Sequence, residues 1–168
     1  YVYHGMLEIN INADQPERLP SLPLDLMMNV ANPDRAFQLQ QSPNSGVGLA
    51  RLEFIINRMI GVHPKALLNF DSLPRETKQI VEKRISGYAS PVDFYVDKLV
   101  EGISTLAAAF TPKRVIVRLS DFKSNEYANL IGGTIYEPDE ENPMLGFRGA
   151  SRYISDAFRD CFELECRA

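Results

Sequence analysis

The chain has no tryptophan, only two cysteines and two histidines, and no long apolar stretch among its 168 residues. Its apolar runs are short, such as TLAAAF before Pro112, whereas a helix that spans a bilayer needs roughly 20 apolar residues. No basic segment followed by an apolar one opens the chain, as it would in a secretory signal. We therefore expect no membrane segment, no export and a cytoplasmic location.

The sequence has fewer basic than acidic residues. Lysine and arginine number 18 against 22 aspartates and glutamates, which gives a net charge of -4 and an isoelectric point near 5.2. Nucleic acids and anionic membranes attract surfaces on which Lys and Arg cluster, so an acidic chain argues against both partners. Any anion that binds to this chain has to be met by a local group of cations.

The few cysteines and histidines indicate neither a disulfide nor a metal site. Cys161 and Cys166 fall in one predicted helix, where their spacing places them on different faces. His4 and His63 are isolated, and His63 has no acid or thiol at ligand spacing. We expect reduced thiols, a reducing compartment and no metal bound by these residues.

The composition, with 45% hydrophobic and 24% charged residues, is that of a globular chain with one core of standard size. Residues 1–21 alternate apolar and polar positions and then become rich in proline, which predicts an extended segment and a linker. A folded unit is expected at residues 22–168. Because the chain starts at Tyr1 and stops at Ala168 inside a helical stretch, we expect a fragment of a longer protein.

Strand and helix signals alternate along this unit. The expected order is a strand at 24–30, a helix opened by Asn32 and Pro33, a strand in GVGLARLEF, helical segments from 53 to 87 broken at Pro64 and Pro74, a helix from Pro91 capped by Ser90, a strand in KRVIVRLS, and a last helix from about Gly149. This alternation predicts an α/β fold in which a parallel sheet is packed by helices.

Two of the predicted strands end in arginine, Arg51 in GVGLARLEF and Arg118 in RVIVRLSDF. In parallel sheets and β/α barrels, the carboxyl ends of the strands form the ligand-binding face. A third arginine, Arg148, lies between Gly146 and Gly149, where the backbone can approach a ligand closely and a helix is expected to begin. Guanidinium forks pair bidentately with carboxylate or phosphate, so the pattern predicts a pocket for a small dianion.

A purely structural interpretation of these arginines is equally open. A strand-end arginine commonly pairs with a nearby carboxylate, which would be Glu53 or Asp121 here. The GVG of the second strand lacks the rest of a dinucleotide or phosphate-loop motif, and no Ser/His/Asp or Cys/His nucleophile can be argued.

The segments that follow the third strand are polar. DFKSNEYANLIGG is expected to form a loop and a short helix capped by Ser124, with Lys123 and Asn125 facing either the pocket or the solvent. The acidic run EPDEEN, at residues 137–142, is expected to be a solvated loop.

Four longer motifs carry a resemblance to a known family: MMNVANPDRAF, GVGLARLEFIINRMIGVHP, KRVIVRLSDFKSNEYANLIGG and EENPMLGFRGASRY. Together they resemble the phosphoenolpyruvate (PEP) synthase family (pyruvate, water dikinase), in its carboxyl-terminal PEP-utilising β/α barrel. Pyruvate phosphate dikinase and the phosphotransferase system's enzyme I share the GLxRxE strand and the NPxLGxR loop. The form RLSDFKSNEYANLIGG favours the synthase over these two alternatives.

The resemblance implies an incomplete (β/α)8 TIM-type barrel that contains only the first βα units. It implies that ATP phosphorylates a histidine on a swivelling domain, which passes the phosphoryl group to pyruvate enolate held by Mg²⁺. The products are phosphoenolpyruvate, AMP and phosphate. Arg51, Arg118 and Arg148 match the family's arginines in GLxRxE, VRLSDF and NPxLGxR, and so are implied to bind substrate.

Other parts of the family's machinery have no counterpart in this sequence. The ATP-binding domain, the phosphohistidine, the catalytic cysteine and the Glu and Asp that bind Mg²⁺ are expected outside the segment, and Cys161 and Cys166 do not match that cysteine. We therefore expect no activity from the segment alone.

Two classes of function remain: part of an intact enzyme, or a stand-alone small-anion-binding or regulatory module. An unclosed barrel exposes strand edges that the remaining strands would cover in the intact enzyme, so we expect the segment alone to self-associate. We also expect a homo-oligomer.

Overall fold

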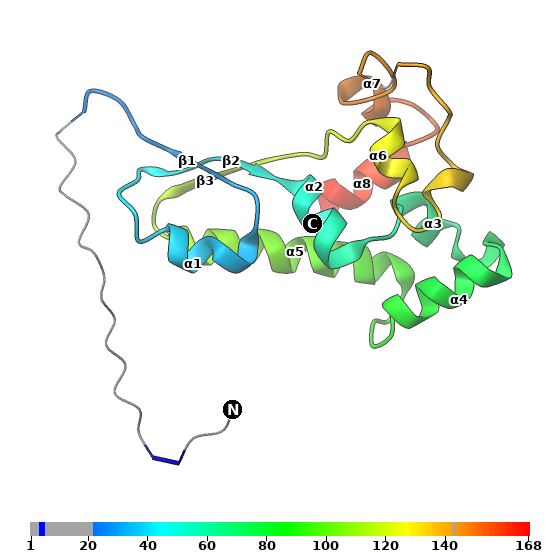
Figure 1. Cartoon of the computed structure of the whole chain (residues 1–168), viewed down its shortest axis with the longest axis horizontal. Helices are drawn as coiled ribbons and strands as arrows, with labels where there is room; N and C mark the ends of the chain where they lie inside the picture. Colours follow the sequence, from blue (N-terminus) through cyan, green and yellow to red (C-terminus); the bar gives the residue numbers. More distant parts are fainter. Residues whose placement is uncertain (1–3, 6–21, 143) are drawn as a thin grey trace.

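The computed structural model describes residues 4–5, 22–142 and 144–168 and shows a mixed α/β fold (Figure 1). Three short strands form one parallel sheet, and helices pack against it. The extended segment and linker predicted at residues 1–21 lie outside the described residues, apart from residues 4 and 5. Among the described helices, none is both long and apolar enough to cross a bilayer.

The sheet contains β1 (Met28–Val30), β2 (Gly46–Arg51) and β3 (Arg114–Arg118), in that order and all parallel. Gly46 opens β2 at a φ of +130°, and a Cβ at this position would overlap the carbonyl oxygen of Arg114. The close pairing of β2 with β3 therefore requires glycine there. The register pairs Arg51 with Arg118, so the two strand-end arginines lie side by side.

The helices follow the predicted order, and two predicted caps are confirmed. Asn32 accepts a hydrogen bond from the Asp34 N–H at 3.1 Å, and Ser90 accepts one from the Asp93 N–H at 3.0 Å. The helical segments are η1 (Pro33–Arg35), α1 (Ala36–Leu39), α2 (Leu52–Ile55), the π-helical η2 (Ile56–Ile60), α3 (Pro64–Leu68), η3 (Phe70–Ser72), α4 (Arg75–Arg84), α5 (Pro91–Phe110), α6 (Ser124–Ala128), η4 (Gly133–Ile135), α7 (Ala150–Tyr153) and α8 (Arg159–Arg167).

Two predicted elements have different bounds from those expected. The first strand is shorter than 24–30, because only Met28–Val30 pairs with β2. The single helix expected from Gly149 is two helices, α7 and α8. The hydroxyl of Ser155 accepts a hydrogen bond from the Ala157 N–H at 3.2 Å, and such a local bond competes with continuation of the helix.

The long helix α5 connects two parts of the core. Its second half packs Leu106 and Phe110 against Val47 and Ala50 of β2, and so covers one face of the sheet together with α1 (Figure 1). Its first half enters a larger cluster with residues of α2, α3, α6 and α8. Ile116, in the middle of β3, is 45% exposed.

No further strand lies beside β1 or β3 among the described residues, so both are edge strands. The parallel α/β arrangement is therefore confirmed. The partial barrel implied by the resemblance is not established by this open sheet.

Candidate functional site

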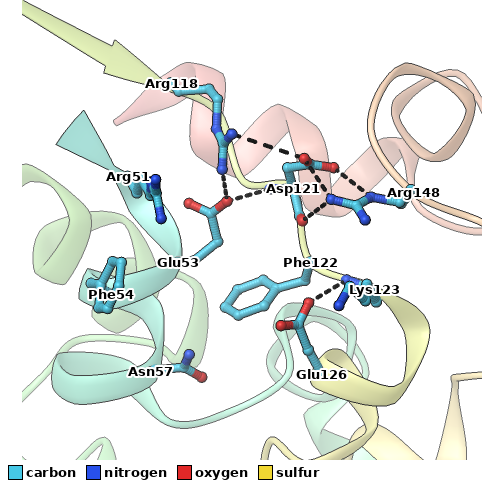
Figure 2. Close-up of a pocket in the computed structure, with 10 residues that line it drawn as sticks. All are labelled: Arg51, Glu53, Phe54, Asn57, Arg118, Asp121, Phe122, Lys123, Glu126 and Arg148. Carbon is cyan, nitrogen blue, oxygen red and sulfur yellow. Dashed lines mark hydrogen bonds and ion pairs between the residues drawn. The ribbon is translucent and has the colours of Figure 1, made fainter. Parts of the chain in front are cut away.

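A cavity of about 340 Å³ lies at the carboxyl ends of β2 and β3 (Figure 2). Its position is the one at which parallel α/β sheets bind ligands. The three predicted arginines all line it, although they come from β2, β3 and the loop before α7. The lining residues are Arg51, Glu53, Phe54, Asn57, Arg118, Asp121, Phe122, Lys123, Glu126 and Arg148.

Arg51 and Arg118 reach this cavity as neighbours because their strands are paired in register. Arg118 donates a hydrogen bond to the Glu53 carboxylate, and its guanidinium lies 4.0 Å from the Asp121 carboxylate. Arg51, by contrast, is exposed and forms no ion pair within the part of the chain that the structure describes. One of the two strand-end guanidinium groups is therefore available to a ligand without first leaving a carboxylate.

Arg148 enters from the opposite side and is held by Asp121 (Figure 2). Its Nε and Nη2 donate to the two carboxylate oxygens of Asp121 at 3.1 and 2.8 Å, which is a bidentate pair. The hydrogen bond from Arg148 holds the pKa of Asp121 below its usual range. Asp121 thus faces both Arg118 and Arg148.

The cavity combines four cations with three carboxylates. The carboxylate of Glu53 accepts from Arg118 and from the backbone N–H of Asp121, the latter at 3.0 Å. Its second oxygen is buried and has no hydrogen-bond partner among the described residues. Arg118 and Arg148 are therefore held in place by carboxylates that an incoming anion can replace or supplement, and the surplus of cations favours such an anion.

The structure thus contains features of both interpretations of the arginines. Arg118 and Arg148 pair with Glu53 and Asp121, as the structural interpretation predicts, while all three arginines also line one cavity. Pairing and anion binding are compatible, because these guanidinium groups remain partly exposed: 43% of the Arg118 side chain and 28% of the Arg148 side chain are accessible.

The polar segment after β3 divides between two surfaces. Lys123 lines the arginine cavity, whereas Asn125 lines a separate one with Glu140 and other polar residues. The predicted cap is wrong: Ser124 is the first residue of α6, and the Lys123 N–H is bonded by the Glu126 carboxylate at 2.8 Å. Ser124 is instead fully buried, and its hydroxyl accepts a hydrogen bond from Arg152 at 2.9 Å.

A buried ionic cluster was missed by the sequence interpretation. Glu137, in the run expected to be solvated, has a side chain only 3% exposed and accepts hydrogen bonds from Arg152 at 2.6 and 2.7 Å. His63 completes the cluster, with its Nε2 3.0 Å from a Glu137 oxygen. Arg152 lies over the rings of Tyr127 and Phe147, at 4.6 and 4.4 Å from their centroids. The acidic loop is therefore anchored in the core by this carboxylate.

Burial and mutual hydrogen bonding shift the pKa values of His63 and Glu137 in this cluster. Burial lowers the pKa of His63 and outweighs the opposing effect of Glu137. Burial alone would raise the pKa of Glu137, but hydrogen bonds from His63 and Arg152 hold it below its usual range. Nδ1 of His63 accepts the Lys65 N–H at 3.1 Å, so the neutral tautomer with a proton on Nε2 satisfies both ring nitrogens.

The remaining candidate groups give no metal or disulfide site. Cys161 is buried and Cys166 is exposed, and both thiols are free. Burial raises the pKa of Cys161 to about 12. Within the described ranges, no three His, Cys, Asp or Glu side chains gather as a metal-binding group. These residues do not form a site for the Mg²⁺ that the resemblance implies.

Comparison with known proteins agrees with the resemblance. Residues 11–168 match the family model described as PEP-utilising enzyme, PEP-binding domain. Phosphoenolpyruvate synthases of Pseudomonas aeruginosa, Escherichia coli and Neisseria meningitidis are 73%, 66% and 60% identical to the whole of this chain, which covers 21% of each. The chain thus spans about a fifth of the length of these relatives. Because the family model covers nearly all of it, the chain belongs to the PEP-utilising enzymes and matches their PEP-binding domain.

Proposed function

We propose that this chain supplies part of the substrate site of a phosphoenolpyruvate synthase. The observation that carries the proposal is the convergence of Arg51, Arg118 and Arg148 on one cavity at the carboxyl edge of a parallel sheet. The reaction proposed is phosphoryl transfer from a phosphohistidine, charged by ATP, to pyruvate enolate. Its products are phosphoenolpyruvate, AMP and phosphate, and the sheet is the start of a (β/α)8 barrel that the rest of the protein closes.

The three arginines have complementary roles in this proposal. Pyruvate carries a carboxylate and phosphoenolpyruvate adds a phosphate, and both are groups that a planar guanidinium binds through two hydrogen bonds. Arg51, which has no ion pair among the described residues, binds an anionic group of the substrate first. Arg118 then shares its donors between Glu53 and the substrate.

Arg148 has the geometry to act on the phosphoryl group. It lies across the cavity from the strand ends and is fixed through Asp121. In a loose phosphoryl-transfer transition state, negative charge spreads over the equatorial oxygens, and preorganised donors stabilise that charge. Together the arginines hold pyruvate enolate and the transferred group in line.

Several components are supplied from outside this chain in the proposal. They are the ATP-binding domain, the phosphohistidine, the catalytic cysteine and the carboxylates that hold Mg²⁺. The names of the relatives support the synthase over pyruvate phosphate dikinase and the phosphotransferase system's enzyme I. The open edges β1 and β3 also support self-association of the isolated segment.

The experiment that tests the proposal is a pyruvate-dependent assay of AMP formation from ATP. The full-length protein that contains this segment should form AMP and phosphoenolpyruvate in step with each other. The purified segment alone should form neither, because it lacks the ATP-binding domain and the phosphohistidine. A full-length protein that makes no phosphoenolpyruvate would favour the alternative of a stand-alone anion-binding or regulatory module.

A further inference from the structure

The peptide just after β3 is held by side chains from two distant helices. Ser120 is 1% exposed and lies between Arg118 and Asp121, which both line the cavity. Its N–H donates to the Glu165 carboxylate at 3.0 Å, and its carbonyl oxygen accepts from the Tyr153 hydroxyl. The strand pairing of β2 and β3 ends at Arg118, so these side chains replace the sheet as partners of the Ser120 backbone.

The hydroxyl of Ser120 belongs to the same network. It donates to the second oxygen of the Glu165 carboxylate and lies 2.8 Å from the Tyr127 hydroxyl. With Glu165 ionised, the Tyr127 hydroxyl donates to the Ser120 hydroxyl, which in turn donates to the Glu165 carboxylate. The backbone, the side chain and the flanking residues of Ser120 are therefore fixed together.

Glu165 is an unusual residue for this place in α8. Its side chain is buried, the residue being 4% exposed, and it forms no ion pair in the part of the chain that the structure covers. Burial raises its pKa, although the hydrogen bonds from Ser120 oppose this effect. A buried carboxylate without a cation costs stability relative to an apolar side chain of similar size. Its presence is better explained by the geometry that it imposes on Ser120.

We propose that Glu165 and Tyr153 are positioning residues for the substrate site. They fix the Ser120 peptide, and through it the directions in which Arg118 and Asp121 enter the cavity; Asp121 in turn holds Arg148. The proposal rests on the function proposed above, because it assigns these two residues to the same phosphoryl-transfer step. Misplacement of reacting groups by about 1 Å can lower a rate on the order of a hundredfold.

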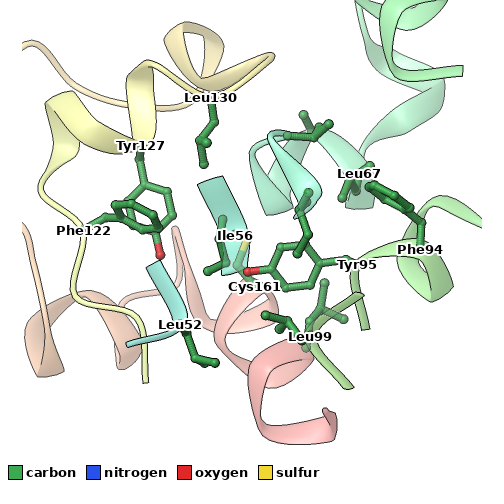
Figure 3. Close-up of a cluster of buried hydrophobic side chains, with 14 of the residues drawn as sticks. Leu52, Ile56, Leu67, Phe94, Tyr95, Leu99, Phe122, Tyr127, Leu130 and Cys161 are labelled. Atoms are coloured by element: carbon green, nitrogen blue, oxygen red, sulfur yellow. The ribbon is translucent and has the colours of Figure 1, made fainter. Parts of the chain in front are cut away.

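The test compares two tyrosine-to-phenylalanine variants of the full-length protein. Tyr153→Phe removes the hydroxyl that bonds the Ser120 carbonyl, whereas Tyr95→Phe removes a buried hydroxyl that has no partner among the described residues (Figure 3). Tyr153→Phe should lower kcat for phosphoenolpyruvate formation by about tenfold, with KM for pyruvate changed less, because positioning acts in the transition state. Tyr95→Phe should leave both constants unchanged.

Glu165→Gln extends the test with a nearly isosteric change. It should lower kcat at least as much as Tyr153→Phe, while phosphorylation of the swivelling domain by ATP proceeds at the normal rate in all three variants. A purely structural role would instead lower the melting temperature and the folded fraction, and would leave kcat per folded molecule unchanged. If Glu165→Gln does not fold, the comparison of the two tyrosine variants decides the matter.

The outcome separates this proposal from the proposed function. If Arg118→Lys lowers phosphoenolpyruvate formation but Tyr153→Phe and folded Glu165→Gln match Tyr95→Phe, the positioning role is overturned and the substrate site stands. If Arg118→Lys itself has no effect, the proposed function fails first.

Discussion

The cavity and the buried core of the described structure both pair arginines with carboxylates, but the two regions differ in their access to solvent. At the cavity, Arg118 and Arg148 pair with carboxylates while 43% and 28% of their side chains remain accessible. In the core, the Arg152 side chain is only 2% exposed and is paired with Glu137. An exposed pair can exchange its carboxylate for a ligand, but a buried pair cannot do so without exposing charge to an apolar environment. In our proposal, the same residue type therefore serves binding in one region and architecture in the other.

The largest effect on stability is expected from the buried pair of Arg152 and Glu137. Arg152→Met keeps much of the side-chain volume but leaves the Glu137 carboxylate buried without its main cation. Removal of one partner of a buried ion pair costs about 3–5 kcal/mol, so the unfolding free energy of the full-length protein should fall by that amount in chemical denaturation. Arg75→Met, the same change at an exposed position of α4, is the matched control and should shift it by less than about 0.5 kcal/mol. Equal effects of the two changes would remove the distinction between the regions.

The next effect is expected at the cavity and concerns catalysis instead of stability. Arg51→Lys and Arg118→Lys keep the positive charge but lose the fork that binds an anion bidentately. Each change should lower pyruvate turnover by at least about a hundredfold, or roughly 2.7 kcal/mol, which is the scale of losing one preorganised donor. Melting temperature and the ATP half-reaction should be almost unchanged. A lower melting temperature with normal turnover of the folded fraction would show that these arginines are structural only.

A smaller effect on stability is expected from a change of pH, and it arises from His63 in the buried cluster with Glu137 and Arg152. The pKa of His63 is lowered from 6.5 in the folded state, so below about pH 6.5 the unfolded chain takes up a proton that the folded chain does not. Stability should therefore fall on acidification, by at most about 1.4 kcal/mol per pH unit from this group. Glu137, whose pKa is also lowered, acts in the same direction at lower pH, whereas Glu165, whose pKa is raised, opposes it.

The histidine contribution of this segment can be isolated, because its two histidines, His4 and His63, can be replaced one at a time. His63→Gln should reduce the loss of melting temperature between pH 7.5 and 5.5, since it removes the proton uptake by the unfolded chain at this position. His4→Gln, at an exposed position, should leave the loss as it is in the parent protein. A parent-like loss in His63→Gln would mean that the buried cluster is not the source of acid sensitivity.

Sequence patterns predicted the cavity better than the buried cluster, for a physical reason. Arg51 and Arg118 each end an apolar run, and parallel pairing brings the ends of such runs to one edge. The caps Asn32 and Ser90 act on backbone groups two or three residues away, so they too can be recognised locally. The caps at Asn32 and Ser90 and the parallel strands were therefore confirmed, whereas the cap expected at Ser124 was wrong.

The interactions that escaped prediction join residues far apart in the chain. Glu137 lies in an acidic run that reads as solvated, and only the folded structure brings it to His63 and Arg152. The contact between Ser120 and Glu165 likewise depends on how α8 packs against the end of β3. Neither has a local pattern, because a buried carboxylate is recognisable only when its donors are known.

The most direct test of the central claim is the affinity of the full-length protein for phosphoenolpyruvate, measured by calorimetric titration of the Arg51→Lys variant. Arg58→Lys is the matched control, because Arg58 lies nearby in η2 but outside the cavity lining. We expect Arg51→Lys to weaken binding by at least about tenfold, or roughly 1.4 kcal/mol, and Arg58→Lys to leave it unchanged. Equal affinity of Arg51→Lys and the parent protein would contradict the account, because the one strand-end arginine that is not engaged by a carboxylate in the described structure would then not bind the substrate.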